Sequence, residues 1–170
     1  KNISLYKYLG GHKNNQLPLP LMNIINGGVH ANNSLRIQEF MIRPESPKTF
    51  SEAVRMCFLV IQNLKNILDR RKLSTTVGDE GGFAPSLDKN EDAIDLILES
   101  IEKSGFKPGE DISICLDVAA NELYKDKKYS IFSSKFVEPK HAMNYYLDLI
   151  NNYPIKSIED PFSEDDWSSW

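Results

Sequence analysis

The chain has 170 residues, of which 41% are hydrophobic, so it can bury one sizeable core. Its 20 Lys and Arg residues against 24 Asp and Glu leave a net charge of −4 and no basic stripe, which argues against a nucleic-acid partner. No apolar stretch approaches the roughly 20 residues of a membrane span and no signal-peptide pattern opens the chain, so we expect a soluble protein.

Two short apolar runs come first. The run at 19–25 is closed by Asn26-Gly27-Gly28, a turn signal, and the run at 35–42 is closed by Arg43-Pro44. We expect two strands that pair as neighbours without a helix between them.

Three helices are predicted further along the chain. Apolar residues at helical spacing fill 50–68, where Thr49 and Glu52 fit a capping box. A second helix begins at Asn90 as N-cap and ends near Gly105, and a third spans 139–152 before Tyr153-Pro154.

Strand-like runs occupy 112–117 and 155–159, and a hairpin is expected at 122–132 around residues 125–128. The acidic segment that closes at Trp170 resembles the opening of another helix, and both ends of the chain look cut. The alternation of strands and helices predicts an α/β fold with parallel β/α units, in one incomplete domain covering residues 1–170.

Only two cysteines are present, Cys57 and Cys115, each inside an apolar run and without a CxxC or His-Cys pattern. We expect two buried free thiols in a reducing compartment, with no disulfide and no zinc site.

Four apolar runs end on carboxylates, and this is the most informative pattern in the sequence. The acids are Glu39, the pair Asp79-Glu80, Asp117, and the pair Glu159-Asp160. If these runs are neighbouring parallel strands, their acidic ends meet on one rim, where they repel unless a cation or shared protons offset the charge. Successive acidic strand ends favour the catalytic face of a barrel, of which 170 residues would supply a little over half.

Asp117 and Glu159 suit Mg²⁺, which prefers hard oxygen donors and takes one or two protein carboxylates. Taken singly, Asp117 could instead cap a turn and Glu159 could pair with a cation, but four such acids in succession favour a metal site. Burial and charge crowding are expected to make Glu80 a proton donor near neutral pH. His30 either contacts substrate or is a solvated loop residue, and His12 and His141 are expected at the surface.

Six stretches of the chain together resemble an internal part of the enolase family, whose members are glycolytic phosphopyruvate hydratases. They follow one another in family order at 5–11 (LYKYLGG), 21–31 (LMNIINGGVHA), 37–41 (IQEFM), 77–85 (VGDEGGFAP), 116–120 (LDVAA) and 157–161 (SIEDP). The resemblance implies a modified TIM-type (β/α)₈ barrel whose second strand is antiparallel.

The resemblance also implies reversible, Mg²⁺-dependent dehydration of 2-phosphoglycerate to phosphoenolpyruvate. By this similarity Asp117 and Glu159 hold magnesium and Glu80 protonates the departing hydroxyl. Glu39 assists beside that hydroxyl and also contacts substrate, as His30 and Gln38 do. Asp79 and Asp160 only shape the acidic rim.

Several family features are missing from the 170 residues. The third metal carboxylate, the base lysine, the phosphate-binding arginine and serine, and an N-terminal α+β domain have no counterpart in the sequence, so we expect the 170-residue polypeptide alone to be inactive. The family usually has glycine near Lys127, where lysine needs another turn or some strain. Leu123 replaces a common aromatic.

Two other functions stay open. One is another Mg²⁺-dependent member of the superfamily that acts on a carboxylate, and the other is a non-catalytic, protein-binding role of an enolase-like surface. The resemblance implies a cytoplasmic protein, with a cell-surface or secreted fraction possible for the family, and a dimer or octamer for the full-length protein.

Overall fold

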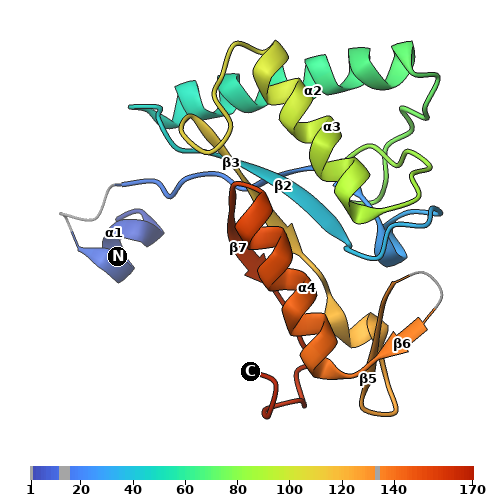
Figure 1. Cartoon of the computed structure of the whole chain (residues 1–170). Helices are drawn as coiled ribbons and strands as arrows, with labels where there is room; N and C mark the ends of the chain where they lie inside the picture. Colours follow the sequence, from blue (N-terminus) through green and yellow to red (C-terminus); the bar gives the residue numbers. More distant parts are fainter. Residues whose placement is uncertain (1, 12–15, 133–134) are drawn as a thin grey trace.

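The computed structural model of the chain describes residues 2–11, 16–132 and 135–170 (Figure 1). The helices are α1 (Leu5–Gly10), α2 (Phe50–Arg70), α3 (Asn90–Lys103) and α4 (Pro139–Asn152), with short 3₁₀ turns η1 (Gly28–His30) and η2 (Ala120–Leu123). The strands are β1 (Met22–Asn26), β2 (Glu39–Pro44), β3 (Ile112–Asp117), β4 (Tyr124–Lys125), β5 (Lys128–Phe132), β6 (Lys135–Val137) and β7 (Ile155–Glu159).

Four strands form the main sheet in the order β1-β2-β3-β7. β2 is antiparallel to both of its neighbours, whereas β3 and β7 are parallel. No helix lies between β1 and β2, as expected, and the sheet is mixed because the second strand is reversed. This arrangement confirms the predicted part of a modified barrel.

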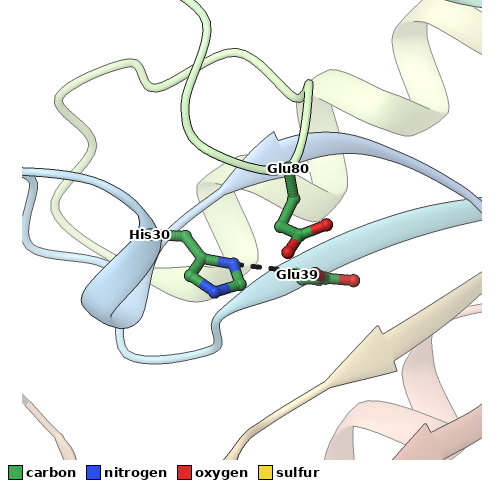
Figure 2. Close-up of side chains that lie close together, drawn as sticks. All are labelled: His30, Glu39 and Glu80. Carbon is green, nitrogen blue, oxygen red and sulfur yellow. Dashed lines mark ion pairs between the residues drawn. The ribbon is translucent and has the colours of Figure 1, made fainter.

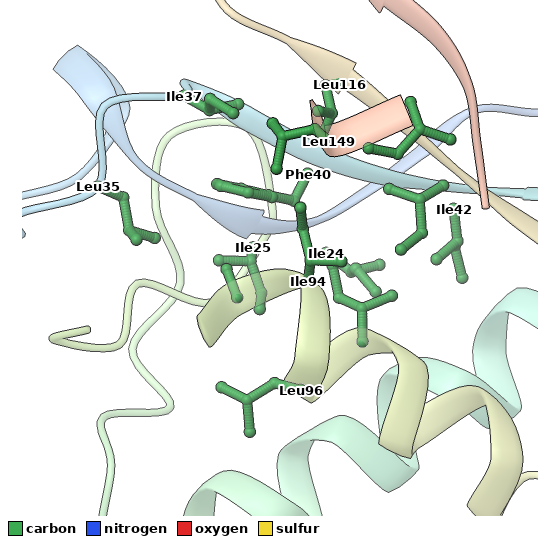
Figure 3. Packing of buried hydrophobic residues seen from close by; sticks show 14 of the residues in the cluster. Ile24, Ile25, Leu35, Ile37, Phe40, Ile42, Ile94, Leu96, Leu116 and Leu149 are labelled. Atoms are coloured by element: carbon green, nitrogen blue, oxygen red, sulfur yellow. The ribbon is translucent and has the colours of Figure 1, made fainter. Parts of the chain in front are cut away.

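The core lies between this sheet and the helices. α2 and α3 pack together over one side of the sheet, and α4 runs beside β7 (Figure 1). Phe40 and Ile42 of β2 belong to the same buried cluster as Ile94 of α3, which lies near Phe40 (Figure 3). Alternate residues of the strands therefore face the core, and the residues between them face the opposite side.

The boundaries of the first strands differ from the prediction. β2 begins at Glu39 rather than at residue 35, and it includes Arg43-Pro44, which the sequence suggested would close it. Leu35 and Ile37 are buried in the loop before β2. Their apolar side chains therefore gave the sequence the same pattern as a strand. The run at Val77 forms only isolated bridges through Phe83, and it is a loop rather than a strand.

The helices begin and end close to the predicted positions, with one change of cap. Thr49 caps α2 as expected, since its Oγ1 accepts a hydrogen bond from the Glu52 amide at 3.2 Å. At α3 the N-cap is Lys89, whose amide donates to Asp92, so the prediction of Asn90 as cap was wrong. The Asn90 side chain instead accepts from the amides of Arg36 and Ile37.

The predicted hairpin forms between β4 and β5 and gains a third strand, β6. Lys125 pairs with Lys128, so Asp126 and Lys127 alone make the turn. Both have positive φ, +51° and +61°, as a type I′ turn requires. Lys127 therefore adopts the left-handed conformation that glycine takes more easily, which is the strain expected from the sequence.

The structure also describes the end of the chain, an additional helix and the two cysteines. The segment after β7 forms turns up to Trp170 rather than the start of a helix. Helix α1 was not predicted, and all its residues are partly or fully exposed. Cys57 and Cys115 are both free and buried, as expected. Within the part of the chain that the structure describes, no helix has the length and apolarity needed to cross a membrane.

Candidate active site

Three carboxylates lie in one row across the end of the main sheet. Glu39 on β2 is the register partner of Asp117 on β3, and Asp117 is the partner of Glu159 on β7. Register partners on adjacent strands project to the same face, about 5 Å apart at the backbone. Glu39, Asp117 and Glu159, hereafter the carboxylate row, therefore share one face and one end of the sheet.

The row arises differently from the prediction. Asp117 and Glu159 do end parallel strands, but Glu39 opens β2 rather than ending it. Because β2 is antiparallel to β3, its first residue lies beside the last residue of β3. The condition that all four runs are parallel strands is not met, and the antiparallel second strand that the resemblance implied accounts for the same convergence.

His30 and Glu80 reach Glu39 from two loops (Figure 2). His30 ends the short turn η1, and its Nδ1 lies 3.6 Å from Glu39 Oε1, longer than a hydrogen bond. Glu80 comes from the loop at 78–82, and one possible ligand atom from each of these three residues lies within 4.8 Å of the others. The structure thus groups His30, Glu39 and Glu80, as far as the described residues show.

The burial expected for Glu80 is not found. Glu80 is exposed, whereas the side chains of His30 and Glu39 are only 20% and 16% exposed. The loop brings Glu80 to the acidic rim but leaves it open to solvent in this structure. What supports a role for Glu80 in proton transfer is therefore its position, since its carboxylate lies within 4.8 Å of Glu39.

Burial and mutual repulsion raise the pKa of each carboxylate in the row. Burial is the largest cause at Glu39, followed by the charges of Asp117 and Glu80. Glu159 is exposed as a residue, but partial desolvation of its carboxylate still comes first, followed by the charge of Asp117 and then that of Asp160. Asp117 therefore disfavours ionisation of both of its neighbours in the row, and Asp160 is the like charge that raises the pKa of Asp117 itself.

The pKa of Asp117 is raised mainly by burial, although two hydrogen bonds oppose the shift. The Ala119 amide donates to Asp117 Oδ1 at 2.9 Å, and the side chain of Gln38 also bonds the carboxylate. Asp117 therefore caps a turn, as the plainer interpretation of the sequence suggested. Ala119 has φ +49°, a left-handed conformation, so the turn holds the carboxylate at a cost in backbone strain.

Two sets of side chains could take a metal ion. Asp117 and Glu159 offer oxygen atoms only, which suits Mg²⁺. His30, Glu39 and Glu80 combine nitrogen and oxygen donors, a set that suits zinc and other transition metals better. Among the described residues, no ion pair neutralises Asp117 or Glu159, and their raised pKa values are consistent with a place for a cation.

The other acids and histidines considered in the sequence are exposed or lie outside the described residues. Asp79 and Asp160 are both exposed. His141 is exposed on α4, as expected, and His12 lies outside the described residues.

Sequence reasoning missed Asn26, which pairs in register with Glu39 and is fully buried. An Asn next to Gly-Gly looks like an ordinary turn, so no local signal distinguished it.

Comparisons with known proteins agree with this geometry. Residues 14–170 match the family model described as "Enolase, C-terminal TIM barrel domain". The chain is also 62% identical, over all 170 residues, to a protein of Pelagibacter ubique (strain HTCC1062) named "Enolase". It covers 41% of that relative, so it spans about two fifths of the relative's length. The chain belongs to the enolase family, and its mixed sheet is part of that family's barrel domain.

Proposed function

We propose that the complete protein containing these residues catalyses the reversible dehydration of 2-phosphoglycerate to phosphoenolpyruvate with Mg²⁺. The observation that carries this proposal is the carboxylate row at one sheet end with Glu80 held beside it. Family membership supports the same reaction, since the relative is named "Enolase".

Asp117 and Glu159 are the residues we propose to hold Mg²⁺. They are adjacent in register and carry oxygen donors only, the charge of Asp117 helps to raise the pKa of Glu159, and the pKa of Asp117 is also raised. These properties fit a hard divalent cation, which keeps further positions for water and substrate oxygens. When bound, the ion supplies positive charge against the negative charge that develops on the substrate carboxylate.

Glu80 is the residue we propose to donate a proton to the leaving hydroxyl. The C–O bond breaks as the carbon–carbon double bond forms, and the hydroxyl departs as water with the proton from Glu80. Glu39 lies next to Glu80, and the pKa of Glu39 itself is raised by burial and by the charges of Asp117 and Glu80, so we propose that Glu39 assists beside the leaving hydroxyl. His30 lies beside Glu39 and the Gln38 side chain bonds Asp117, and these two residues are the proposed substrate contacts.

The proton at the substrate's second carbon has to leave to a base elsewhere. No lysine of the 170 residues matches the family's base, and the third metal carboxylate also has no counterpart in this sequence. We therefore propose that this 170-residue polypeptide, purified alone, forms no phosphoenolpyruvate. Turnover by it, with host enzyme excluded, would contradict this point.

The test uses the complete protein and follows phosphoenolpyruvate formation from 2-phosphoglycerate in Mg²⁺. Glu80→Gln keeps the shape of the side chain but removes its ability to donate a proton, and we expect kcat to fall about 10²- to 10⁴-fold. Asp79→Asn, its exposed neighbour in the same loop, is the matched control and should change kcat less than threefold or so. Failure of the wild type to react, or equal effects of the two substitutions, would overturn the proposal.

We further propose a reducing, cytoplasmic location, because both cysteines are free and buried. The homodimer or octamer implied by the resemblance stays a prediction. Sedimentation of the complete protein would measure it directly.

A further inference from the structure

We propose that Asn26 is a positioning residue for Glu80. Its buried side-chain amide packs against the loop at 78–82 and holds that loop in place, and we call this contact the seat of the loop. This inference rests on the proposed function only for its kinetic consequence. The structural part, that Asn26 fixes the loop, stands independently.

Asn26 is held rigidly at the end of β1. Its exposed fraction is 0%, and it pairs in register with Glu39. Asn23 donates a side-chain hydrogen bond to Asn26 Oδ1, which sets the orientation of the amide. The amide nitrogen has no hydrogen-bond partner among the described residues, so it supports the loop by contact.

Two glycines of the loop pack directly on this amide. A Cβ added at Gly78 would lie 2.1 Å from Asn26 Nδ2 and 2.8 Å from the His30 carbonyl oxygen. A Cβ added at Gly82 would lie 2.7 Å from Asn26 Oδ1. Real Cβ atoms do not approach other atoms this closely, so the loop sits on Asn26 only because both positions are glycine.

Backbone hydrogen bonds close the loop over the same strand. The Asn26 amide donates to the Phe83 carbonyl at 2.8 Å, and the Phe83 amide donates to the Ile24 carbonyl at 2.9 Å. The Gly78 amide donates to the Gly82 carbonyl at 2.8 Å, which joins the two ends of the loop. The base of the loop is therefore fixed to β1, and the Asn26 amide fills the space beneath it.

The position of Glu80 depends on the loop backbone, because no described residue holds the Glu80 side chain in place. Among the residues that the structure describes, Glu80 takes part in no hydrogen bond or ion pair and is exposed. Its place beside His30 and Glu39 follows from where the loop backbone lies. A displacement of about 1 Å at a reacting group can lower a rate about 10²-fold.

The test is a double-substitution cycle on the complete protein. Asn26→Ala removes the seat, and we expect kcat for 2-phosphoglycerate to fall about tenfold to a hundredfold with little change in KM. In a Glu80→Gln background the same substitution should change kcat less than twofold or so, because the group that Asn26 positions is already inactive. Equal losses in both backgrounds would show a general structural role and overturn the inference.

Hydrogen exchange tests the structural part without any turnover. In Asn26→Ala the amides of Gly78 and Gly81 should exchange at least about tenfold faster, while those of β3 keep their wild-type rates. Unchanged exchange in the loop would overturn the inference even if kcat fell. If the wild type shows no turnover, the proposed function fails, but this arm still decides whether Asn26 seats the loop.

Two further variants guard against misfolding. Gly78→Ala disrupts the same contact from the side of the loop. If Asn26→Ala does not fold, Gly78→Ala should lower kcat in the wild-type background but not in the Glu80→Gln background. Asn63→Ala is the matched control, because the Asn63 side chain donates to the Leu59 carbonyl within α2 and to the Ser104 hydroxyl at the end of α3, far in sequence from the loop at 78–82. We expect it to lower stability but to leave kcat and loop exchange unchanged.

Discussion

Removing one charge from the carboxylate row should stabilise the metal-free protein and abolish its response to Mg²⁺. Asp117 is the central member, with Glu39 on one side and Glu159 on the other. Asp117→Asn keeps an acceptor for the Ala119 amide and removes the charge that raises the pKa values of both neighbours.

The magnitude follows from the register. Strand spacing places paired side chains about 5 Å apart, where two like charges repel by roughly 1–2 kcal/mol at an effective dielectric constant of about 40–80. Because Glu159 is exposed, solvent screens its repulsion with Asp117. We therefore expect Asp117→Asn to gain about 1 kcal/mol in the free energy of unfolding in EDTA.

The assay is urea unfolding of the complete wild-type and Asp117→Asn proteins, in EDTA and in increasing Mg²⁺. A ligand at 100 times its Kd stabilises the folded state by about 2.7 kcal/mol, so the wild type should overtake the variant as Mg²⁺ rises. The control is Asp111→Asn, because a hydrogen bond from the Lys107 amide lowers the pKa of Asp111, and removing this favourable negative charge should destabilise the protein. The reasoning is refuted if Asp117→Asn is less stable than wild type in EDTA, or if Mg²⁺ stabilises both proteins equally.

Three other outcomes are expected. Because the pKa of Asp117 is higher in the folded than in the unfolded protein, ionising this carboxylate lowers stability as pH rises from the unfolded-state pKa near 4 through the folded-state pKa. The stability advantage of Asp117→Asn in EDTA should therefore vanish below about pH 4 and grow toward neutrality. An advantage independent of pH would exclude this cause. Lys127→Gly should raise the free energy of unfolding by roughly 0.5–1 kcal/mol because it relieves a left-handed lysine, whereas Lys125→Gly in the adjacent strand should lower it. Asn90→Ala should cost about 2–3 kcal/mol in urea unfolding, because the amides of Arg36 and Ile37 lose their acceptor, and Asn90→Asp, which keeps an acceptor, should cost less.

The sequence predicted the periodic elements well because their signals are local. Helix α2 follows from apolar spacing and the Thr49 cap, and β3 and β7 follow from short apolar runs that end on acids. The strand at 35–42 was misplaced because Leu35 and Ile37 are buried by the fold around them rather than by a strand. Burial in a loop and burial in a strand have the same appearance in a short sequence window.

The roles of the site residues stay predictions, and the sequence did not predict how the structure arranges these residues. Pairing between strands decides that Glu39 opens a reversed strand beside Asp117, and no local pattern contains that information. The exposure of Glu80 and the seat provided by Asn26 depend on contacts between segments about 50 residues apart. These contacts explain why the glycines at 78 and 82 are needed, which the sequence alone presented as an ordinary turn.

The most direct measurement is the position of Mn²⁺, used in place of Mg²⁺, in a crystal of the complete protein. Anomalous diffraction should place the ion in contact with carboxylate oxygens of Asp117 and Glu159, at about 2.0–2.3 Å, with Glu80 outside its ligands. An ion bound instead by His30, Glu39 and Glu80 would contradict the assignment of magnesium to the strand ends and of proton donation to Glu80.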